Sequence, residues 1–477
     1  MIKNKSFLIF LAALLINPNL SFAAIINVPG DFSSIQQAID KSVAGDTVLV
    51  GPGTYFENIK FRGKGITVAS KYIIDKDYNH IFNTIIDGSK PTHKDTGSVA
   101  IFMSGETSVS VLDGFTLTNG TGTRTLDGNW IEGGGIVVEH ASPIIKNNII
   151  INNEAKVRDG CNGGGGGGIS TIRGCPQIIN NRIISNKSGY AGGIVLNWSG
   201  GIVRNNVIYG NSATGHWGTG GLMVWDLPEV QPQIVENNTI VGNHSVSTAG
   251  GLSIDRSANI TVKNNIIWGN DQVSGGQVKS NGTGKVAYSN VEGGFDGEGN
   301  INAAPGFMKD SCFLLSTTSP CIDAGENVTE FNDLADPQKT SSALFPSMGG
   351  VRNDMGAYGG PLANYIPAFL EAACEINSNE GPTGMDINKS NAMINISNFP
   401  NPVKNYTVFE YSLSETSIIN LTIYDVQGRK AENLINSTVS SGEHTFLYEN
   451  KNLKNGIYFY TLQYKNHQIT KKLVVTL

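Results

Sequence analysis

The sequence predicts an all-β protein whose main body is a right-handed parallel β-helix, a single-chain solenoid of short stacked strands. Glycine makes up 58 of the 477 residues, and charged residues make up only 16%, against averages of about 7% and about 25%. This composition favours many tight turns between short strands over helices. Two markers that recur in step through the middle of the chain, an asparagine pair and a glycine pair, are the stronger evidence.

The first marker is a pair of asparagines that follows a short apolar run. Pro143–Ile149 is repeated as Pro176–Arg182, and successive pairs are 33, 25, 32 and 27 residues apart. A third asparagine lies six residues after the first in every unit, so the variation in length falls in the loops between units. The first asparagines are Asn147, Asn180, Asn205, Asn237 and Asn264, and the third are Asn153, Asn186, Asn211, Asn243 and Asn270. We interpret them as structural residues at a corner, because asparagine tolerates left-handed backbone and can hydrogen-bond to the asparagine of the next coil.

The second marker, two glycines followed by isoleucine or leucine, precedes each asparagine pair. Its five copies begin at Gly134, Gly167, Gly192, Gly220 and Gly250. A unit of this length holds two or three short strands but no crossover helix, so it must stack on its neighbours to bury its apolar face. The markers therefore predict roughly eight to ten coils, with the first asparagines in one column and the glycines at corners that need a positive φ.

Residues 1–23 have the pattern of a secretory signal peptide. Lys3 and Lys5 precede an apolar run from Phe7 to Ile16, and Ser21–Ala23 is a small-x-small cleavage site. No later stretch approaches the roughly 18 apolar residues of a membrane span, so we expect an exported mature protein that has none. The net charge of −6 gives no reason to expect nucleic acid as a partner.

Residues 33–43 predict a short amphipathic helix that covers the open end of the first coil. Ile35 and Ile39 follow at helical spacing, and Asp31 and Ser33 are the candidate N-caps.

The opening of the predicted β-helix resembles that of pectate-lyase-like β-helix proteins. The resemblance rests on Val28–Phe32, Ile35–Ile39 and Gly51–Tyr55, and it extends over about residues 25–300. That family includes polysaccharide lyases, glycoside hydrolases and esterases as well as adhesins, so the resemblance implies the fold and leaves the activity open. Clear catalytic motifs of the β-helix hydrolases, pectin esterases and epimerases are not found in this sequence.

Two further segments follow the β-helix, to which we assign residues 24–300. Residues 301–361, with motifs such as Asp354–Tyr358, resemble the extension of surface-anchored bacterial proteins of the choice-of-anchor Q type, and we expect them to cap the last coil. Residues 362–392 become rich in asparagine, serine and glycine, which predicts a linker.

Residues 393–477 predict a small β-sandwich of about seven antiparallel strands. Four motifs there, Asn398–Pro402, Tyr424–Arg429, Asn455–Tyr458 and Lys471–Val475, resemble the sorting domain of the type IX (Por) secretion system. The resemblance implies the type IX machinery as a partner, export across the outer membrane, and a location at the cell surface or in the medium. The alternative is a carbohydrate-binding sandwich.

Five cysteines remain, and export permits disulfides. Proximity in sequence favours bonds between Cys161 and Cys175 and between Cys312 and Cys321, which leaves Cys374 over. None of them has metal-ligand spacing.

The candidate site residues follow the glycine markers. Strand alternation points the third residue after each marker's apolar residue outward, and the fourth ends the strand. The third positions are Glu139, Ile172, Asn197, Trp225 and Asp255, and the fourth are His140, Arg173, Trp198, Asp226 and Arg256. We therefore expect two adjacent exposed columns of acids, bases and aromatic rings, with rungs about 4.8 Å apart, near the rise of one sugar unit.

Such columns suit a chain-like glycan. The expected catalytic residues are Glu139, His140, Arg173, Asp226 and Asp255, and the expected substrate-binding residues are Trp198, Trp225 and Arg256. A lyase needs a base such as His140 or Arg173 near the proton α to a carboxylate, and a hydrolase needs two carboxylates such as Asp226 and Asp255. The alternative is an ordinary solvated polar face.

We expect a secreted or surface-attached protein that acts on or binds extracellular polysaccharide, with a lyase favoured over a hydrolase. The alternatives are a non-catalytic adhesin or glycan-binding protein and a purely structural spacer, so the sequence leaves open whether the protein is an enzyme. No metal site is predicted. Calcium is the cation to consider, and its weak candidate, Asp296–Asn300, fits a polar turn better.

Overall fold

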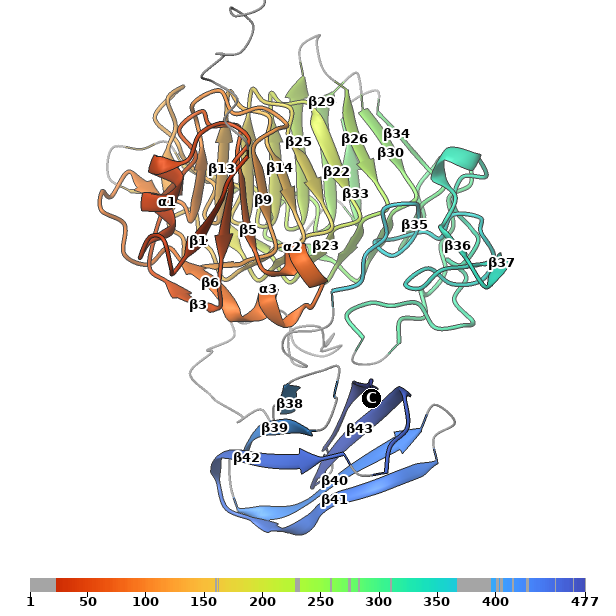
Figure 1. Cartoon of the computed structure of the whole chain (residues 1–477). Helices are drawn as coiled ribbons and strands as arrows, with labels where there is room; N and C mark the ends of the chain where they lie inside the picture. The colour runs from red at the N-terminus through yellow and green to blue at the C-terminus, as the bar shows by residue number, and fades with distance from the viewer. Residues whose placement is uncertain are drawn as a thin grey trace, which may run out of the picture. The chain divides into compact units, whose positions relative to one another are not determined.

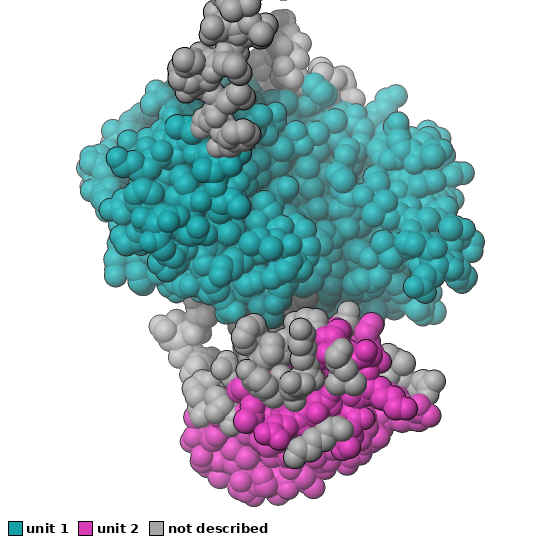
Figure 2. Space-filling view, viewed as in Figure 1, with its two compact units in different colours: residues 1–383 teal, residues 384–477 magenta. Residues whose placement is uncertain are grey.

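The computed structural model describes two stretches of the chain. These are residues 23–366, except 159, 160, 162, 228–231, 258, 259, 273–275, 282, 283, 309 and 310, and residues 396–476, except 400–402, 404, 405, 414, 415, 426–428, 451 and 466. All but the last residue of the predicted signal peptide and most of the predicted linker lie outside them. The chain divides into two compact units, residues 1–383 and 384–477 (Figure 2).

The first unit is the predicted right-handed parallel β-helix, and three long parallel sheets form its walls (Figure 1). The ten-stranded sheet contains β1 (Ile25–Val28), β2 (Thr47–Val50), β5 (Thr67–Ser70), β9 (Val111–Asp113), β14 (Ile144–Lys146), β18 (Gln177–Ile179), β22 (Gly201–Arg204), β26 (Gln233–Glu236), β30 (Ile260–Lys263) and β34 (Lys285–Ala287). The nine-stranded sheet contains β3 (Gly53–Tyr55), β6 (Thr84–Asp87), β10 (Thr116–Thr118), β15 (Ile149–Ile151), β19 (Arg182–Ile184), β23 (Val207–Tyr209), β27 (Thr239–Val241), β31 (Ile266–Trp268) and β35 (Asn290–Val291). The eight-stranded sheet contains β4 (Ile59–Lys60), β8 (Ala100–Phe102), β13 (Ile136–Glu139), β17 (Ile169–Ile172), β21 (Ile194–Asn197), β25 (Leu222–Leu227), β29 (Leu252–Ser257) and β33 (Val278–Ser280).

One end of the β-helix is covered by α1 (Ile35–Lys41), as predicted. The side chains of Ile35 and Ile39 are fully buried in the core that runs through the coils. The N-cap is Ser34, whose hydroxyl accepts a hydrogen bond from the Gln37 N–H. The predicted N-caps were wrong, because Ser33 bonds to the Gln37 side chain and Asp31 accepts the N–H of Asn27 within the preceding turn.

The asparagines lie in the predicted columns, but the three asparagine positions of the repeat have different structural roles. The first asparagine of each pair has a left-handed backbone, with φ between 51° and 57°. The second and third asparagines are buried and bond from coil to coil, as in Asn206 Nδ2 to Asn238 Oδ1 and Asn211 Nδ2 to Asn243 Oδ1. The first position therefore supplies the turn, and the other two supply the amide ladders.

Residues 354–364, which we call the strap, run along the column of first asparagines. The strap starts near the last coils, where Asn264 accepts the Gly356 N–H. It then passes Asn205, whose amide donates to the carbonyls of Ala357 and Gly359, and ends where the Asn364 amide donates to Asn147. Apolar side chains of the same C-terminal region, among them Tyr358 and Ile366, pack on the outer face of the nine-stranded sheet. That face is therefore covered.

The marker glycines serve close packing and not, as predicted, a positive φ. All ten are described, and none has a φ in the left-handed region. A Cβ added to Gly168 would lie 2.8 Å from the carbonyl oxygen of Gly193 in the next coil. The equivalent glycines of the other markers face the neighbouring coil in the same way, so a side chain there would push the coils apart.

A smaller sheet covers the N-terminal part of the eight-stranded sheet from outside. It consists of β7 (Thr96–Gly97), β11 (Gly122–Arg124), β12 (Ile131–Glu132) and β16 (Gly164–Gly165). The Ser170 hydroxyl of β17 donates to the Glu132 carboxylate of β12, so this sheet lies directly on the outer face of β17.

The remaining short elements of the first unit lie at the corners and in the C-terminal region. They are α2 (Tyr72–Asp75), α3 (Asn79–Asn83), β20 (Lys187–Ser188), β24 (Ser212–Ala213), β28 (His244–Ser245), β32 (Asp271–Gln272), η1 (Thr329–Phe331), β36 (Ala335–Asp336) and β37 (Lys339–Ala343).

Both predicted disulfides are wrong. Cys161, Cys175 and Cys321 are thiols, whereas Cys312 is disulfide-bonded; Cys374 lies outside the described residues. For Cys161 and Cys175, proximity in sequence misleads because β17 lies between them along the coil and separates them.

The second unit is the predicted seven-stranded antiparallel sandwich. One sheet contains β38 (Ile396–Phe399), β39 (Tyr406–Leu413) and β42 (Gly442–Glu449), and the other contains β40 (Ser417–Asp425), β41 (Lys430–Val439), β43 (Gly456–Tyr464) and β44 (His467–Val475). Phe409 and Tyr460 pack together between the sheets with ring centroids 4.9 Å apart.

Candidate functional site

The predicted third-position column is present in the register of the eight-stranded sheet. Glu139 pairs with Ile172, and the column continues through Asn197 and Trp225 to Asp255. The residues that precede Glu139, Asn197 and Trp225, namely Val138, Leu196 and Val224, belong to the core, so the column points away from the core as alternation requires.

The fourth-position column has a left-handed backbone at the end of the strand. His140, Arg173, Trp198 and Arg256 have φ values between 47° and 54°, and all four side chains are exposed. We call these four residues the exposed corner. Asp226 lies within β25, and its side chain lies outside the described part of the chain.

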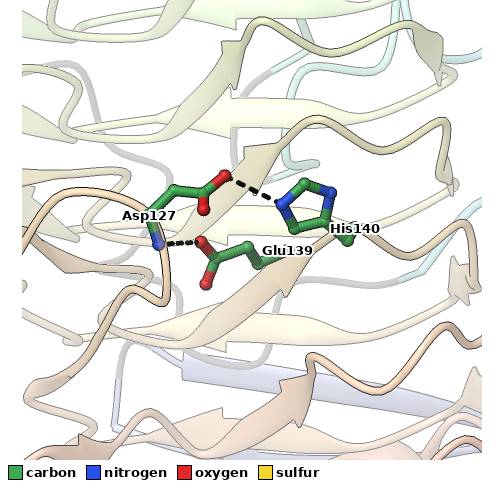
Figure 3. Close-up of side chains that lie close together, drawn as sticks. All are labelled: Asp127, Glu139 and His140. Atoms are coloured by element: carbon green, nitrogen blue, oxygen red, sulfur yellow. Dashed lines mark hydrogen bonds and ion pairs between the residues drawn. The ribbon is translucent and has the colours of Figure 1, made fainter.

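Glu139 is not on an exposed face, so that expectation was wrong. Its side chain is fully buried, and its two carboxylate oxygens accept the N–H groups of Leu126 and Asp127 at 2.8 and 2.9 Å. The turn between β11 and β12, residues 125–130, therefore folds over Glu139 (Figure 3). The repeat markers do not predict this burial, because the turn belongs to residues 122–132, a segment that carries neither the asparagine nor the glycine marker.

Asp127, at the tip of that turn, was not predicted as a site residue. Its Oδ2 atom accepts from His140 Nε2 at 2.8 Å and lies 3.0 Å from Arg173 Nη1 (Figure 3 shows the histidine pair). His140 and Arg173 are on neighbouring coils, so one carboxylate bridges two rungs of the exposed corner. The spacing of the repeat does not predict this contact, because Asp127 lies outside the repeated segments.

Trp198 continues the exposed corner from Arg173. The Arg173 guanidinium lies 5.8 Å from the Trp198 ring centroid, within cation–π range. The Trp198 side chain is 40% exposed, which leaves ring surface open to solvent. Trp225, in contrast, packs partly against Val195 and Met223, so it belongs in part to the surface packing of the sheet.

Asp255 and Arg256 extend the two columns by one coil. Asp255 is half-buried beside Trp225 in register, and Arg256 is exposed. The pair of Asp226 and Asp255 expected for a hydrolase has no described geometry, because the Asp226 side chain lies outside the described residues.

A second buried carboxyl group lies behind the corner. Glu132 is buried against β17, and burial is the main cause that raises its pKa to about 7, while the hydrogen bond from Ser170 opposes the rise and the charge of Glu139 adds to it. Two neighbouring buried acids therefore support the covering sheet and the turn that carries Asp127.

Asp127, Glu139 and His140 offer ligand atoms that lie within 4.8 Å of one another, a geometry that a metal ion can use. Calcium prefers oxygen ligands, and the imidazole fits it poorly. Both oxygens of Glu139 already accept backbone N–H groups, and Arg173 already places a positive charge on Asp127. The donor set is therefore better satisfied by the protein itself than by calcium. In the weaker candidate, the Asn300 amide donates to the carbonyls of Val286 and Phe295, as expected of a polar turn.

The β-helix and the antiparallel sandwich define a repeat protein with a separate C-terminal unit. Residues 113–297 match the family model of the right-handed β-helix region. Residues 397–476 match the family model of the secretion system C-terminal sorting domain. The chain thus carries the sorting domain of the type IX system behind a β-helix, and the protein is located at the cell surface or outside the cell. None of the described helices is long and apolar enough to cross a membrane.

Two solved structures resemble the chain at a low level. One is the PL6 family alginate lyase AlyGC, with a TM-score of 0.25 and 15% identity over 62% of this chain and 56% of that one. The other is the enzymatically active domain of bacteriophage CBA120 tailspike protein 4, with a TM-score of 0.23 and 10% identity over 85% of this chain and 60% of that one. The chain thus spans less than two thirds of either structure. No curated protein matches it.

Proposed function

We propose that this secreted protein binds an acidic extracellular polysaccharide along the exposed corner, and that β-elimination is the reaction it performs. The observation that carries the proposal is the exposed corner itself. Arg173, Trp198 and Arg256 occupy left-handed positions that bulky residues adopt only at a cost of about 1 kcal/mol or more each. Residues that folding disfavours point to a role in function.

The chemistry of the corner suits a chain of uronate sugars. Arg173 and Arg256 present positive charges to carboxylates, and Trp198 presents a ring face on which a sugar can stack. Neighbouring rungs are about 4.8 Å apart, so successive sugar units meet successive coils.

The arrangement favours elimination over hydrolysis. With its Nε2–H donated to a carboxylate, which is that of Asp127 in the free protein, the Nδ1 atom of His140 can accept the proton α to the carboxylate of a sugar unit, while Arg173 stabilises the charge that develops on the substrate. The bond between the β carbon and the glycosidic oxygen then breaks, a carbon–carbon double bond forms in the product, and the departing oxygen takes up a proton from water. Hydrolysis needs two carboxylates, and of the two beside His140, Asp127 is paired with Arg173 and Glu139 is buried beneath the turn with both oxygens engaged.

The test is an assay of the mature protein on acidic and neutral polysaccharides, with ultraviolet absorbance for unsaturated products and a reducing-end assay for hydrolysis. We expect unsaturated products from an acidic glycan, and Trp198→Ala should weaken its binding several-fold. Trp217→Ala, which removes another exposed tryptophan before the start of β25, is the matched control. Binding without product would assign the protein to the glycan-binding class, which the ion pairs on His140 and Arg173 also suit. Binding that survives both Trp198→Ala and Asp226→Asn would place the glycan-binding surface elsewhere.

A further inference from the structure

We propose that Asp127 is a latch: its carboxylate occupies, in the free protein, the place that a ligand carboxylate takes between His140 and Arg173. This inference rests on the proposed function, since it names the group that the exposed corner recognises. It also assigns a role to a residue outside the repeat.

The position of Asp127 Oδ2 is that of a bound anion. A single oxygen accepts from His140 Nε2 at 2.8 Å and lies 3.0 Å from Arg173 Nη1, and these two donors belong to successive coils. A uronate carboxylate of a glycan lying along the coils would meet the same two donors.

The turn that carries Asp127 is attached in a way that allows it to lift. Its tip is tied to the β-helix through the Leu126 and Asp127 N–H groups, which donate to Glu139. Leu126 is 68% exposed, and Trp130, at the base of the turn, packs against Tyr190 with ring centroids 5.8 Å apart, so apolar packing holds the base of the turn and not Leu126 and Asp127. Polar contacts of this kind exchange readily with those of a ligand and water.

The ion pairs of the latch are weak enough to be displaced. The Asp127 and Arg173 side chains are 39% and 52% exposed, and exposed pairs of this kind change an equilibrium by up to about fivefold. Removing the Asp127 charge should therefore tighten the binding of an acidic glycan by about two- to fivefold.

The experiment measures dissociation constants of the full mature chain for polygalacturonate, alginate and a neutral glucan. Asp127→Asn should bind an acidic glycan two- to fivefold more tightly, and Arg173→Ala should bind it more weakly. Asp271→Asn is the matched control, because it removes the same kind of exposed pair, with His244 at 2.9 Å, from another corner. In hydrogen exchange, the amides of residues 125–130 should lose protection when the acidic glycan binds.

Each other outcome overturns the latch. If the wild type binds and Asp127→Asn binds equally or less tightly, Asp127 positions the two cations and the latch alone fails. If neither protein binds any of the glycans, the proposed function fails with it. If zinc or calcium raises the thermal midpoint of the wild type but not that of Asp127→Asn, the carboxylate serves a metal site instead.

Discussion

Two corners that recur along the β-helix have the same backbone conformation and carry very different side chains. The first asparagines of the repeat have φ values between 51° and 57°, and the residues of the exposed corner have φ values between 47° and 54°. Asparagine adopts this conformation readily, whereas arginine and tryptophan do not. At the first corner the backbone therefore explains the residue type, and at the second it does not.

The two corners also differ in what covers them. The strap lies along the asparagine column, and Asn205 and Asn237 donate to its carbonyl groups. The exposed corner meets only the turn that carries Asp127 among the described residues, and Trp198 and Arg256 remain exposed. One corner is part of the scaffold, and the other is available to a ligand.

The largest effect should come from the amide ladder beside the asparagine column. Asn206 lies between Asn181 and Asn238, and its side chain also donates to the carbonyls of Ile178 and Arg204. Asn206→Ala leaves several buried groups without partners, so we expect the free energy of unfolding to fall by about 4 kcal/mol. Urea unfolding of the mature chain followed by circular dichroism measures it.

The matched control is the neighbouring position. Asn205→Gly keeps the left-handed backbone and loses the hydrogen bonds to Ala357 and Gly359, so it should cost only about 1–2 kcal/mol. Equal losses at Asn205 and Asn206 would contradict the division of work between the first and second asparagines.

The register of the stacked strands could be predicted from the sequence because the asparagine and glycine markers recur in every marked coil. The constant offset of six residues between the first and third asparagines fixes both ladders, and the glycine markers fix the eight-stranded sheet. The prediction did not separate the roles of Asn147 and Asn148, since both types of position are asparagine, and it assigned positive φ to glycines that are needed for close packing.

The candidate site was predicted only as far as the repeat extends. His140, Arg173 and Trp198 follow from the markers, but Asp127 comes from an excursion of irregular length. The same excursion buries Glu139, which alternation alone places on the surface. The residue pattern of a coil predicts which side chains point outward, but it does not predict whether another segment of the chain covers them.

Titration offers a second way to separate the two corners, because amide ladders do not titrate and Glu132, a buried acid behind the exposed corner, does. The pKa of Glu132 is raised from 4.5 to about 7, so its contribution to stability is complete below pH 4.5 and is lost as the pH rises to 7. Glu132→Gln removes this loss. We expect the variant to equal the wild type near pH 4.5 and to exceed it by up to about 3 kcal/mol at pH 8.

Urea midpoints of the wild type and Glu132→Gln at several pH values measure the difference. Burial likewise raises the pKa values of Asp333 and Asp354, to about 8 and about 7, so some pH dependence should remain in the variant. A constant difference between the two proteins across this range would mean that folding does not raise the pKa of Glu132, and titration would then not distinguish the two corners.

The smallest effect should come from turning one rung of the exposed corner into an asparagine rung. Arg256 has a φ of 54° and an exposed side chain. Arg256→Asn should stabilise the protein by roughly 0.5–1 kcal/mol, because asparagine fits this backbone better. It should also weaken the binding of an acidic glycan, because a positive charge is lost from the corner.

Arg256→Lys keeps the charge and the unfavourable backbone, so it should retain binding without the gain in stability. If Arg256→Asn lowers stability, or if it gains stability without loss of binding, arginine at this corner is not retained for a ligand and the two corners differ only by chance.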